Sequence, residues 1–269
     1  MSFSEEQHLR YLRHIMLSEV GVEGQLKISN AKVFVVGAGG LGSSVGYYLS
    51  AAGVGTLALI DSDNVDLSNL QRQIAHNINT LGKPKVESAR NAFKSLNPDV
   101  HIIPIKERLT GRNILVLMKD YDIVVDCSDN FATRFLVNDA CVMLRKPLAT
   151  GSVFKFEGQL TVVRPGEGPC YRCLFEGPPP PGSLPDPAET GLLGTIPGVI
   201  GTLQATEVLK LILNIGTVLR GELLIYDALN ASFRKVKVPR NPDCPVCSDH
   251  PTIKELIDYN QRGNDDIRK

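Results

Sequence analysis

The chain has 269 residues, 43% of them hydrophobic, which is enough for a sizeable buried core. Its 29 lysines and arginines balance 29 aspartates and glutamates, so no overall field draws the protein to nucleic acid or to a membrane surface. The N-terminus lacks the apolar core of a secretory signal, and Pro197, Gln204, Glu207 and Lys210 interrupt the most apolar stretch. We therefore expect a soluble, cytoplasmic protein that binds neither nucleic acid nor membrane.

In the first half, apolar runs rich in β-branched residues alternate with helical patterns, after a short amphipathic helix near 4–17. The runs are KVFVVG, TLALID, HIIPI and DIVVDC. The segment KPKVESARNAFKSLN places Val86, Ala89 and Phe93 on one helix face, and the helical segment TRFLVNDACVMLRK precedes another strand, PLATG. This alternation is typical of a parallel sheet covered by helices.

Beyond residue 155 the pattern changes. The segments EGQLTVVRP, GELLIYD and SFRKVKVP are typical of antiparallel strands, with GVIGTLQATEVLKLILN as a buried helix among them. The segment FEGPPPPGSLPDPAETG contains too many prolines for a helix and predicts an extended loop.

These elements predict a single α/β domain over residues 1–269. A Rossmann-like, mostly parallel sheet with helices on both faces is expected over 1–165. Antiparallel strands over 166–247 continue it, with a crossover loop at 176–197 and a polar tail at 248–269.

A glycine turn follows the first apolar run. Gly37, Gly39 and Gly42 have the spacing G-x-G-x-x-G, which lets phosphates approach bare backbone at a helix N-terminus. Asp61 ends the next run, 19 residues beyond Gly42, close to the roughly 20 expected of an acid that hydrogen-bonds a ribose hydroxyl. A nucleotide site is predicted, but this motif alone leaves hydride transfer and ATP chemistry open.

Two C-x-x-C pairs lie in the second half. Four thiolates can close a tetrahedral structural zinc site that leaves no open position for catalysis. Disulfides and redox dithiols are the alternatives, but a cytoplasmic protein rarely keeps disulfides and a redox motif needs no matching pair. Cys127 and Cys141 lie in apolar segments and are expected to be core residues. The predicted zinc ligands are Cys170, Cys173, Cys244 and Cys247.

Charged residues follow the predicted ribose acid. Arg72 in DSDNVDLSNLQRQ and Lys85 in GKPK suit the β- and γ-phosphates of ATP better than a nicotinamide ring. Asp129, in DCSDN, follows a strand end where a carboxylate is a hard ligand for Mg²⁺. Each residue alone has an ordinary explanation as a solvated charge or a helix cap, but their order around one turn favours ATP.

The motifs together resemble the ubiquitin-activating-enzyme superfamily, in the bacterial and archaeal branch that includes the molybdopterin-synthase and thiamine-biosynthesis adenylyltransferases. The segments RYLRHI, GAGGLG, DSDNVDLSNLQRQ, GKPKVE, DCSDN, EGQLTV, CYRC and NPDCPVC occur in the order of that family. The resemblance extends over nearly the whole chain.

The resemblance implies a role for each matching residue. Gly40 and Asp61 would hold the adenosine side of ATP, and Arg13 matches an arginine that such homodimers insert into the partner subunit's site. The predicted phosphate-binding residues are Asn69, Arg72 and Lys85, and the predicted magnesium ligand is Asp129. The whole predicted nucleotide set is Gly37, Gly39, Gly40, Gly42, Asp61, Asn69, Arg72, Lys85, Asp129 and Asn130, and the catalytic set is Arg13, Arg72, Lys85 and Asp129.

The resemblance also implies the reaction. The substrate would be the C-terminal Gly-Gly carboxylate of a ubiquitin-fold sulfur carrier or modifier, which attacks the α-phosphorus of ATP to give an acyl-adenylate and pyrophosphate. Because that carboxylate is already ionised, no general base is needed. The helix at 199–214 and the crossover loop would admit the carrier's tail, with Gly198, Gly201 and Thr202 leaving room for it.

Many relatives carry a crossover-loop cysteine that accepts the activated acyl group, and here Pro187 stands in that place. No cysteine lies between Cys173 and Cys244, so we expect no thioester on the loop and a separate sulfur donor. Two alternatives remain: an NAD-dependent oxidoreductase, and a non-catalytic subunit that scaffolds a heterodimer. The complete phosphate-binding set favours a homodimer with two working sites.

Overall fold

The computed structural model describes residues 3–179 and 190–259, so Pro187 lies outside the described residues. The strands are β1 Lys32–Val36, β2 Thr56–Ile60, β3 His101–Ile105, β4 Ile123–Asp126, β5 Leu148–Phe154, β6 Glu157–Val163, β7 Glu222–Asp227 and β8 Ser232–Lys237. The α-helices are α1 Glu5–Ile15, α2 Gly21–Asn30, α3 Gly40–Ala51, α4 Lys85–Leu96, α5 Ile114–Met118, α6 Phe131–Leu144, α7 Tyr171–Leu174 and α8 Thr195–Leu213. Two short 3-10 helices are η1 Leu67–Asn69 and η2 Ile78–Thr80.

All the described strands join one eight-stranded sheet in the order β3-β2-β1-β4-β5-β6-β7-β8. The pairs from β3 to β5 are parallel and the pairs from β5 to β8 are antiparallel, with the change of direction at the β5–β6 hairpin. The predicted fold class, a parallel Rossmann-like sheet continued by antiparallel strands, is confirmed.

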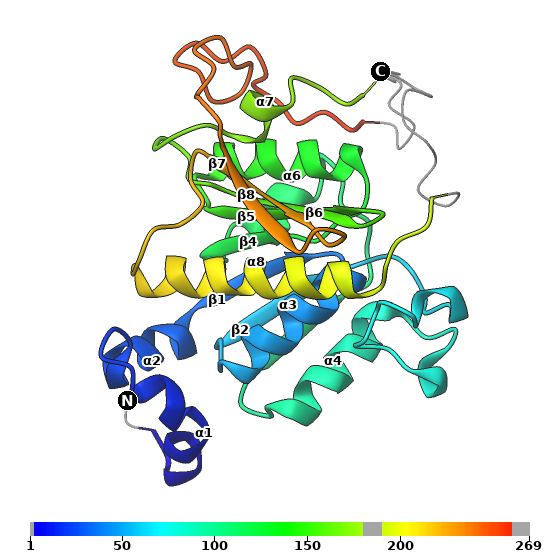
Figure 1. Ribbon diagram of the computed structural model, residues 1–269, viewed down its shortest axis with the longest axis vertical. Coiled ribbons are helices and arrows are strands. Elements are labelled where there is room, and N and C mark those ends of the chain that lie inside the picture. Colours follow the sequence, from blue (N-terminus) through cyan, green and yellow to red (C-terminus); the bar gives the residue numbers. More distant parts are fainter. Residues whose placement is uncertain (1–2, 180–189, 260–269) are drawn as a thin grey trace.

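Helices cover both faces of the parallel part (Figure 1). Side chains alternate along β1, so Val33 and Val35 join the core beneath α3, α4 and α8. Phe34 and Val36 join the opposite core beneath α5 and α6. Burial on both faces explains why this strand is a continuous apolar run rather than an alternating one.

Helix α1 lies away from the carboxyl ends of the parallel strands. Its Tyr11 is buried, and the Tyr11 hydroxyl accepts a hydrogen bond from Asn97 Nδ2 at 2.9 Å, while Arg10 donates to the Leu96 carbonyl at 3.1 Å. These contacts place α1 at the C-terminal end of α4. Gly53, just after α3, also packs against the Tyr11 ring. Since the 12 residues of α3 span about 18 Å, α1 lies about one helix length from the N-terminus of α3.

The sequence did not predict α2, α5 or α7. Helix α2 begins after Val20 with no side-chain cap, and α5 and α7 have only 5 and 4 residues, too few for a helical period to be recognised. Packing holds α2 in place, because Gln25 is fully buried and donates to the Ala52 carbonyl at 2.8 Å.

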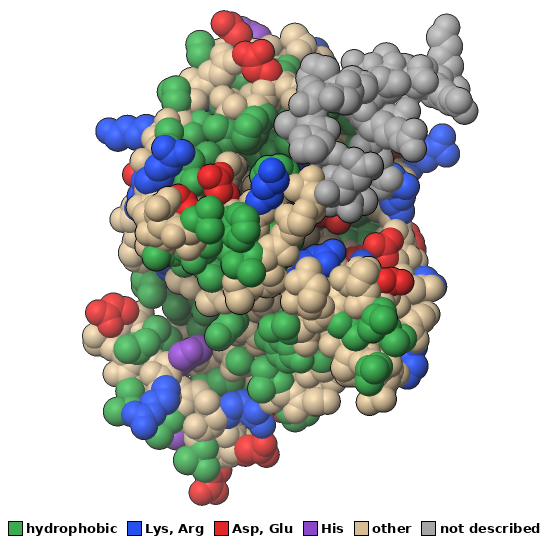
Figure 2. Space-filling model, turned by 45° about the vertical axis from the view of Figure 1, so that its right-hand side comes forward, with side chains coloured by type: hydrophobic (Ala, Val, Ile, Leu, Met, Phe, Trp, Pro, Cys, Tyr) green, Lys and Arg blue, Asp and Glu red, His purple; other side chains and the backbone are tan. Residues whose placement is uncertain are grey.

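Helix α8 is apolar and long enough to cross a membrane, by length and composition alone. It packs on β5, β6 and α3 with Ile196, Ile200, Ala205 and Val208 buried in the core, as the central helix of a globular domain does. In Figure 2, acidic and basic side chains are intermingled over the visible face, as the balanced composition predicts.

Candidate functional site

The turn between β1 and α3 requires glycine at several positions. Gly37 has φ +94°, and a Cβ there would lie 2.8 Å from the Cys127 carbonyl oxygen. A Cβ at Gly42 would overlap the Gly37 carbonyl oxygen, and one at Gly40 would lie 2.8 Å from Pro197 Cβ. No side chain caps α3 at Gly39, so the N–H groups of its first turn can bind an anion.

Two side chains hold Ala38, the second residue of this turn, from opposite sides. Asp61 Oδ2 accepts a hydrogen bond from the Ala38 N–H at 2.8 Å, and Asp61 Oδ1 accepts one from the Asp63 N–H at 2.8 Å. Burial raises the pKa of Asp61 above its ordinary value. On the other side, Nε2 of the buried His76 contacts the Ala38 carbonyl at 2.9 Å, which assigns the proton to Nε2. Asp61 therefore shapes the turn.

The arginine segment, residues 71–73, lies against the same turn. Arg72 is partly buried, and its Nη1 donates to the Ser68 carbonyl at 3.1 Å. Asn69 Oδ1 accepts from the Asp66 N–H at 3.3 Å, so this predicted phosphate ligand also closes the cap of η1. Gln73 is only 5% exposed, and within the described chain its Oε1 has no hydrogen-bond partner. Sequence reasoning missed Gln73.

Lys85 begins α4 and is buried, with its Nζ 2.9 Å from Oδ2 of Asp63. The Asp63 side chain is 65% exposed, so this ion pair lies at the rim of the site. The positive charge of Lys85 also acts on Asp61, whose pKa it lowers against the effect of burial. Lys85 therefore lies close enough to act on Asp61, the residue that holds the glycine turn at Ala38.

Two buried charged side chains, those of Asp126 and Arg134, fix the loop after β4. Asp126 Oδ1 accepts from the Ser128 N–H at 3.0 Å and from its hydroxyl at 2.6 Å, and Asp126 Oδ2 accepts from Thr150 at 2.9 Å. Arg134 donates to the Ser128 carbonyl at 2.8 Å. Ser128 is thus fixed at three atoms, and the next residue, Asp129, is exposed at the loop surface.

Asp129 and Asn130 differ in role. Asn130 is the N-cap of α6, because its Oδ1 accepts from the Thr133 N–H at 2.9 Å. Asp129 Oδ1 accepts a weak hydrogen bond of 3.4 Å from Asn130 Nδ2. The exposed carboxylate of Asp129 is therefore free to bind a cation, whereas Asn130 is occupied by the helix.

Arg13 does not join this group in its own chain. It is exposed on α1, about one helix length from the glycine turn, and within the described residues it makes no hydrogen bond or ion pair. The other predicted nucleotide-binding residues follow β1, β2 and β4, in the loops after these strands or in the first turn of α3 and α4.

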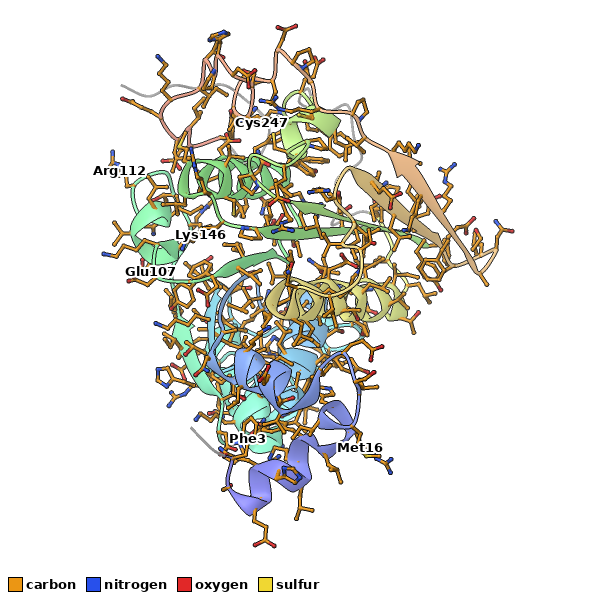
Figure 3. All side chains as sticks on the ribbon, turned by 90° about the vertical axis from the view of Figure 1, so that its left-hand side faces the viewer. Phe3, Met16, Glu107, Arg112, Lys146 and Cys247 are labelled. Carbon is orange, nitrogen blue, oxygen red and sulfur yellow. The ribbon has the colours of Figure 1, made fainter. Side chains whose placement is uncertain are left out.

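The four predicted zinc ligands come together, as expected. Their Sγ atoms all lie within 4.8 Å of one another, with Cys170 to Cys244 at 3.6 Å and Cys173 to Cys247 at 3.4 Å. Zinc–sulfur bonds of about 2.3 Å in a tetrahedron place the sulfurs about 3.8 Å apart, so the cluster fits a metal ion. The cysteines are free thiols in this structure. Figure 3 shows Cys247 at the opposite end of the molecule from Met16, which follows α1.

A buried ion pair attaches the first cysteine pair to α6. Arg172 lies between the two cysteines and donates to both carboxylate oxygens of Asp139 at 2.8 Å. Asn138 Oδ1 accepts from the Tyr171 N–H at 2.8 Å, and the Arg172 guanidinium lies 4.8 Å from the centre of the Phe135 ring. Sequence analysis missed this arrangement, because nothing in the spacing pairs Arg172 with Asp139.

The other two cysteines are core residues, as predicted. Cys127 is 6% exposed and Cys141 is fully buried. Burial raises the pKa of both thiols well above the ordinary value, which disfavours the thiolate that a nucleophile needs.

Comparison with known proteins places the chain in a family. The ThiF family matches residues 11–246. The chain belongs to the ThiF family. Over 264 residues it is 51% identical to a sulfur carrier protein adenylyltransferase of Thermus thermophilus, covering 96% of this chain and 97% of that protein. The resemblance predicted from the motifs is confirmed at the level of the family.

Longer relatives and solved structures agree with this assignment. The chain is 50% identical over 259 residues to the adenylyltransferase and sulfurtransferase MOCS3 of Anopheles gambiae, and it spans 59% of that protein. The structure of E. coli MccB with ATP superposes with a TM-score of 0.78 at 23% identity, covering 92% of this chain and 75% of the other, which shows the shared fold.

Proposed function

We propose that this protein uses ATP to adenylate the C-terminal Gly-Gly carboxylate of a ubiquitin-fold sulfur carrier, releasing pyrophosphate. The enzyme class and the sulfur-carrier substrate class are those of its ThiF relatives. The observation that carries the proposal is that three charged segments adjoin the glycine turn before the uncapped N-terminus of α3. The main chain of Arg72 lies against Gly40, that of Ser128, next to Asp129, lies against Gly37, and Lys85 acts on Asp61, which holds Ala38. A triphosphate and its magnesium ion match these charges, whereas a nicotinamide ring does not.

The residues of this chain fit each part of the nucleotide. The N–H groups of α3 and the side chains of Arg72 and Lys85 would bind phosphate oxygens, and Lys85 would exchange Asp63 for the nucleotide. Asp129 and solvent would hold Mg²⁺, which neutralises charge on the phosphates when bound. The Gln73 amide is a further candidate contact, because its buried oxygen lacks a partner within the described chain; this oxygen would accept from a ribose hydroxyl or the adenine amino group, not from a phosphate.

In the proposed reaction a carrier carboxylate oxygen attacks the α-phosphorus in line. A new bond joins the acyl oxygen to that phosphorus, the bond to the β-phosphate oxygen breaks, and pyrophosphate leaves with the electron pair. Arg72 and Lys85 stabilise the charge of the leaving group. No proton moves, which agrees with a site whose buried histidine, His76, is occupied by Ala38 and Ser88.

We further propose a homodimer in which Arg13 completes the partner subunit's site. Arg13 lies on the same end of the molecule as exposed apolar side chains, including Met16 (67% exposed) and Tyr48 (55%). A cavity of about 160 Å³, lined by residues of α1, α3 and α8, opens beside them. A second copy would cover this apolar surface.

Mixing two inactive variants tests this dimer. If Arg13 acts in trans, Arg13→Ala and Arg72→Ala subunits exchanged in equal amounts regain about a quarter of wild-type activity, because half the dimers contain one intact site of two. If Arg13 acts only in its own chain, the mixture stays inactive.

We assign zinc to the four-cysteine cluster, because four thiolates in a tetrahedron suit Zn²⁺. Zinc there would be structural, since all four positions are taken by sulfur. A separate protein would donate sulfur to the adenylate, and a cytoplasmic location is expected. Metal analysis of the purified protein should find one zinc ion for each chain.

Exchange of labelled pyrophosphate into ATP tests the whole proposal. With Mg²⁺ and a small carrier ending in Gly-Gly, exchange should occur, and it should disappear when the tail is deleted or in Arg72→Ala and Asp129→Ala. ATP binding without exchange with any carrier would instead favour the scaffolding subunit. Binding of NAD that needs no Mg²⁺ would favour the oxidoreductase.

A further inference from the structure

The arginine segment, residues 71–73, lies between two other parts of the chain and contacts both. On one side lies the glycine turn, where a Cβ at Gly40 would be 3.5 Å from the Arg72 carbonyl oxygen. On the other side lies the return segment, residues 190–194, which leads into α8. A Cβ at Gly194 would overlap the Gln71 carbonyl oxygen and lie 2.5 Å from Gln71 Oε1.

Glycine is required at position 194 by close packing against Gln71 and not by its backbone conformation. Gly194 has φ −61° and ψ −22°, which every residue type adopts. An added methyl group would therefore meet the main chain of Gln71 and not a strained turn of its own.

The return segment has anchors on the sheet side. Leu192 forms a parallel bridge with Lys155 in the β5–β6 hairpin, and the Leu193 N–H donates to the Lys155 carbonyl at 3.1 Å. Behind it, Pro197 of α8 packs against Gly40. These anchors oppose movement of the return segment, so that a methyl group at Gly194 would press on the Gln71 main chain.

Within the described residues the Gln71 main chain makes no hydrogen bond, whereas the Arg72 and Gln73 N–H groups that follow it both donate to the Asn69 carbonyl, at 3.1 and 2.9 Å. Gln71 is exposed, the Arg72 guanidinium is held by the Ser68 carbonyl, and Gln73 keeps a buried oxygen without a partner in the described chain. A shift of the Gln71 main chain carries Arg72 with it, and a misplacement of about 1 Å at a binding group can cost about 100-fold in rate.

We propose that Gly194 is a positioning residue for Arg72. Because glycine has no side chain, the return segment packs directly against the Gln71 main chain, and this contact fixes the position of Arg72 beside the glycine turn. This inference rests on the proposed function, in which Arg72 binds the triphosphate. Gly194 would thereby connect the C-terminal end of the crossover loop, which would admit the carrier's tail, with the residues that would bind the nucleotide.

Two matched alanine variants test the proposal. Gly194→Ala adds a methyl group against Gln71, whereas Gly191→Ala adds one in the same segment at an exposed position, with no atom of the described residues within 4 Å. With a non-hydrolysable ATP analogue and Mg²⁺, we expect Gly194→Ala to weaken binding about tenfold and Gly191→Ala less than twofold. Equal affinities in the two variants would overturn the inference.

Coupling to Arg72 is measured in a double-mutant cycle. In an Arg72→Ala background, Gly194→Ala should weaken binding by less than about twofold, because the group that it misplaces is gone. Additive losses would mean that Gly194 acts by another route, and the inference would fail. If Arg72→Ala alone leaves ATP affinity unchanged, the role proposed for Arg72 fails instead.

Hydrogen exchange gives a readout that needs no nucleotide. Amides of residues 66–76 should exchange faster in Gly194→Ala than in the wild type or in Gly191→Ala. Should Gly194→Ala fail to fold, Gln71→Ala removes the side-chain half of the contact from an exposed position. It should weaken analogue binding in the same direction, and wild-type affinity in that variant would contradict the inference.

Discussion

The ion pair between Arg172 and Asp139 offers a sharp test of how the cysteine cluster is attached to the domain. Its two side chains are 3% and 1% exposed, and two parallel hydrogen bonds of 2.8 Å join them. Burial raises the pKa of Asp139, against the lowering effect of Arg172. The Asp139→Asn substitution keeps the shape of the side chain and removes its charge, so that Arg172 remains buried without a counter-charge.

Breaking a buried ion pair by removing one partner costs about 3–5 kcal/mol. In a chain of this size, each kcal/mol lowers the unfolding midpoint by roughly 2–4 °C, so Asp139→Asn should unfold roughly 6–20 °C below the wild type. Arg172→Met combined with Asp139→Leu should recover much of this loss, because neither charge is then buried alone.

Differential scanning calorimetry and urea unfolding measure both effects. The control is Asp249→Asn, whose partner is Arg240 and whose side chain is 83% exposed. A surface pair of this kind contributes at most about 1 kcal/mol. The reasoning is refuted if Asp139→Asn and Asp249→Asn lower stability by similar amounts.

Three further predictions concern the metal, a histidine and a lysine. Cys244→Ser should lose the bound metal and lower the unfolding midpoint, as should a chelator on the wild type; an unchanged midpoint after metal loss would argue against a structural role. Burial lowers the pKa of His76 below its ordinary 6.5, so the unfolded chain binds a proton that the folded chain does not. Stability should therefore fall as pH drops below 6.5, by up to about 1.4 kcal/mol per pH unit from this group. His76→Gln keeps a donor for the Ala38 carbonyl and should show a flatter slope in urea unfolding between about pH 5 and 6.5; equal slopes would exclude His76 as the cause. Lys85→Met should raise the KM for ATP in pyrophosphate exchange but cost less than about 1 kcal/mol of stability, because its partner Asp63 is largely exposed. A Lys85→Met protein with unchanged KM would remove Lys85 from the phosphate site.

The sequence was most informative where one local rule decides the structure. Apolar runs buried on both faces predicted the parallel strands, and the glycine spacing predicted a turn in which Gly37 has φ +94°. The sequence did not predict contacts between residues that are far apart in the chain. The contact between His76 and Ala38 spans 38 residues, and that between Arg172 and Asp139 spans 33. No local pattern encodes such pairs.

The predicted and the missed residues differ in how firmly they are held. Asp126 and His76 are buried, and each has two or more partners within the chain, so they fix the backbone of the loops. The motifs predicted Lys85, Arg72 and Asp129. Their partners are, in that order, the exposed carboxylate of Asp63, the main-chain carbonyl of Ser68 and the side-chain amide of Asn130.

This division has a physical reason. Groups proposed to bind a highly charged nucleotide must release their present partners at low cost, and Lys85, Arg72 and Asp129 are each paired weakly. Groups that hold these residues in place must not move, so they are buried and fully hydrogen-bonded. Gln73, buried and yet without a partner for its oxygen within the described chain, fits neither class. Its oxygen is a hydrogen-bond acceptor without a donor, which is the state expected of a group that contacts a bound ligand, and under the proposed function that donor would belong to the ribose or the adenine of ATP.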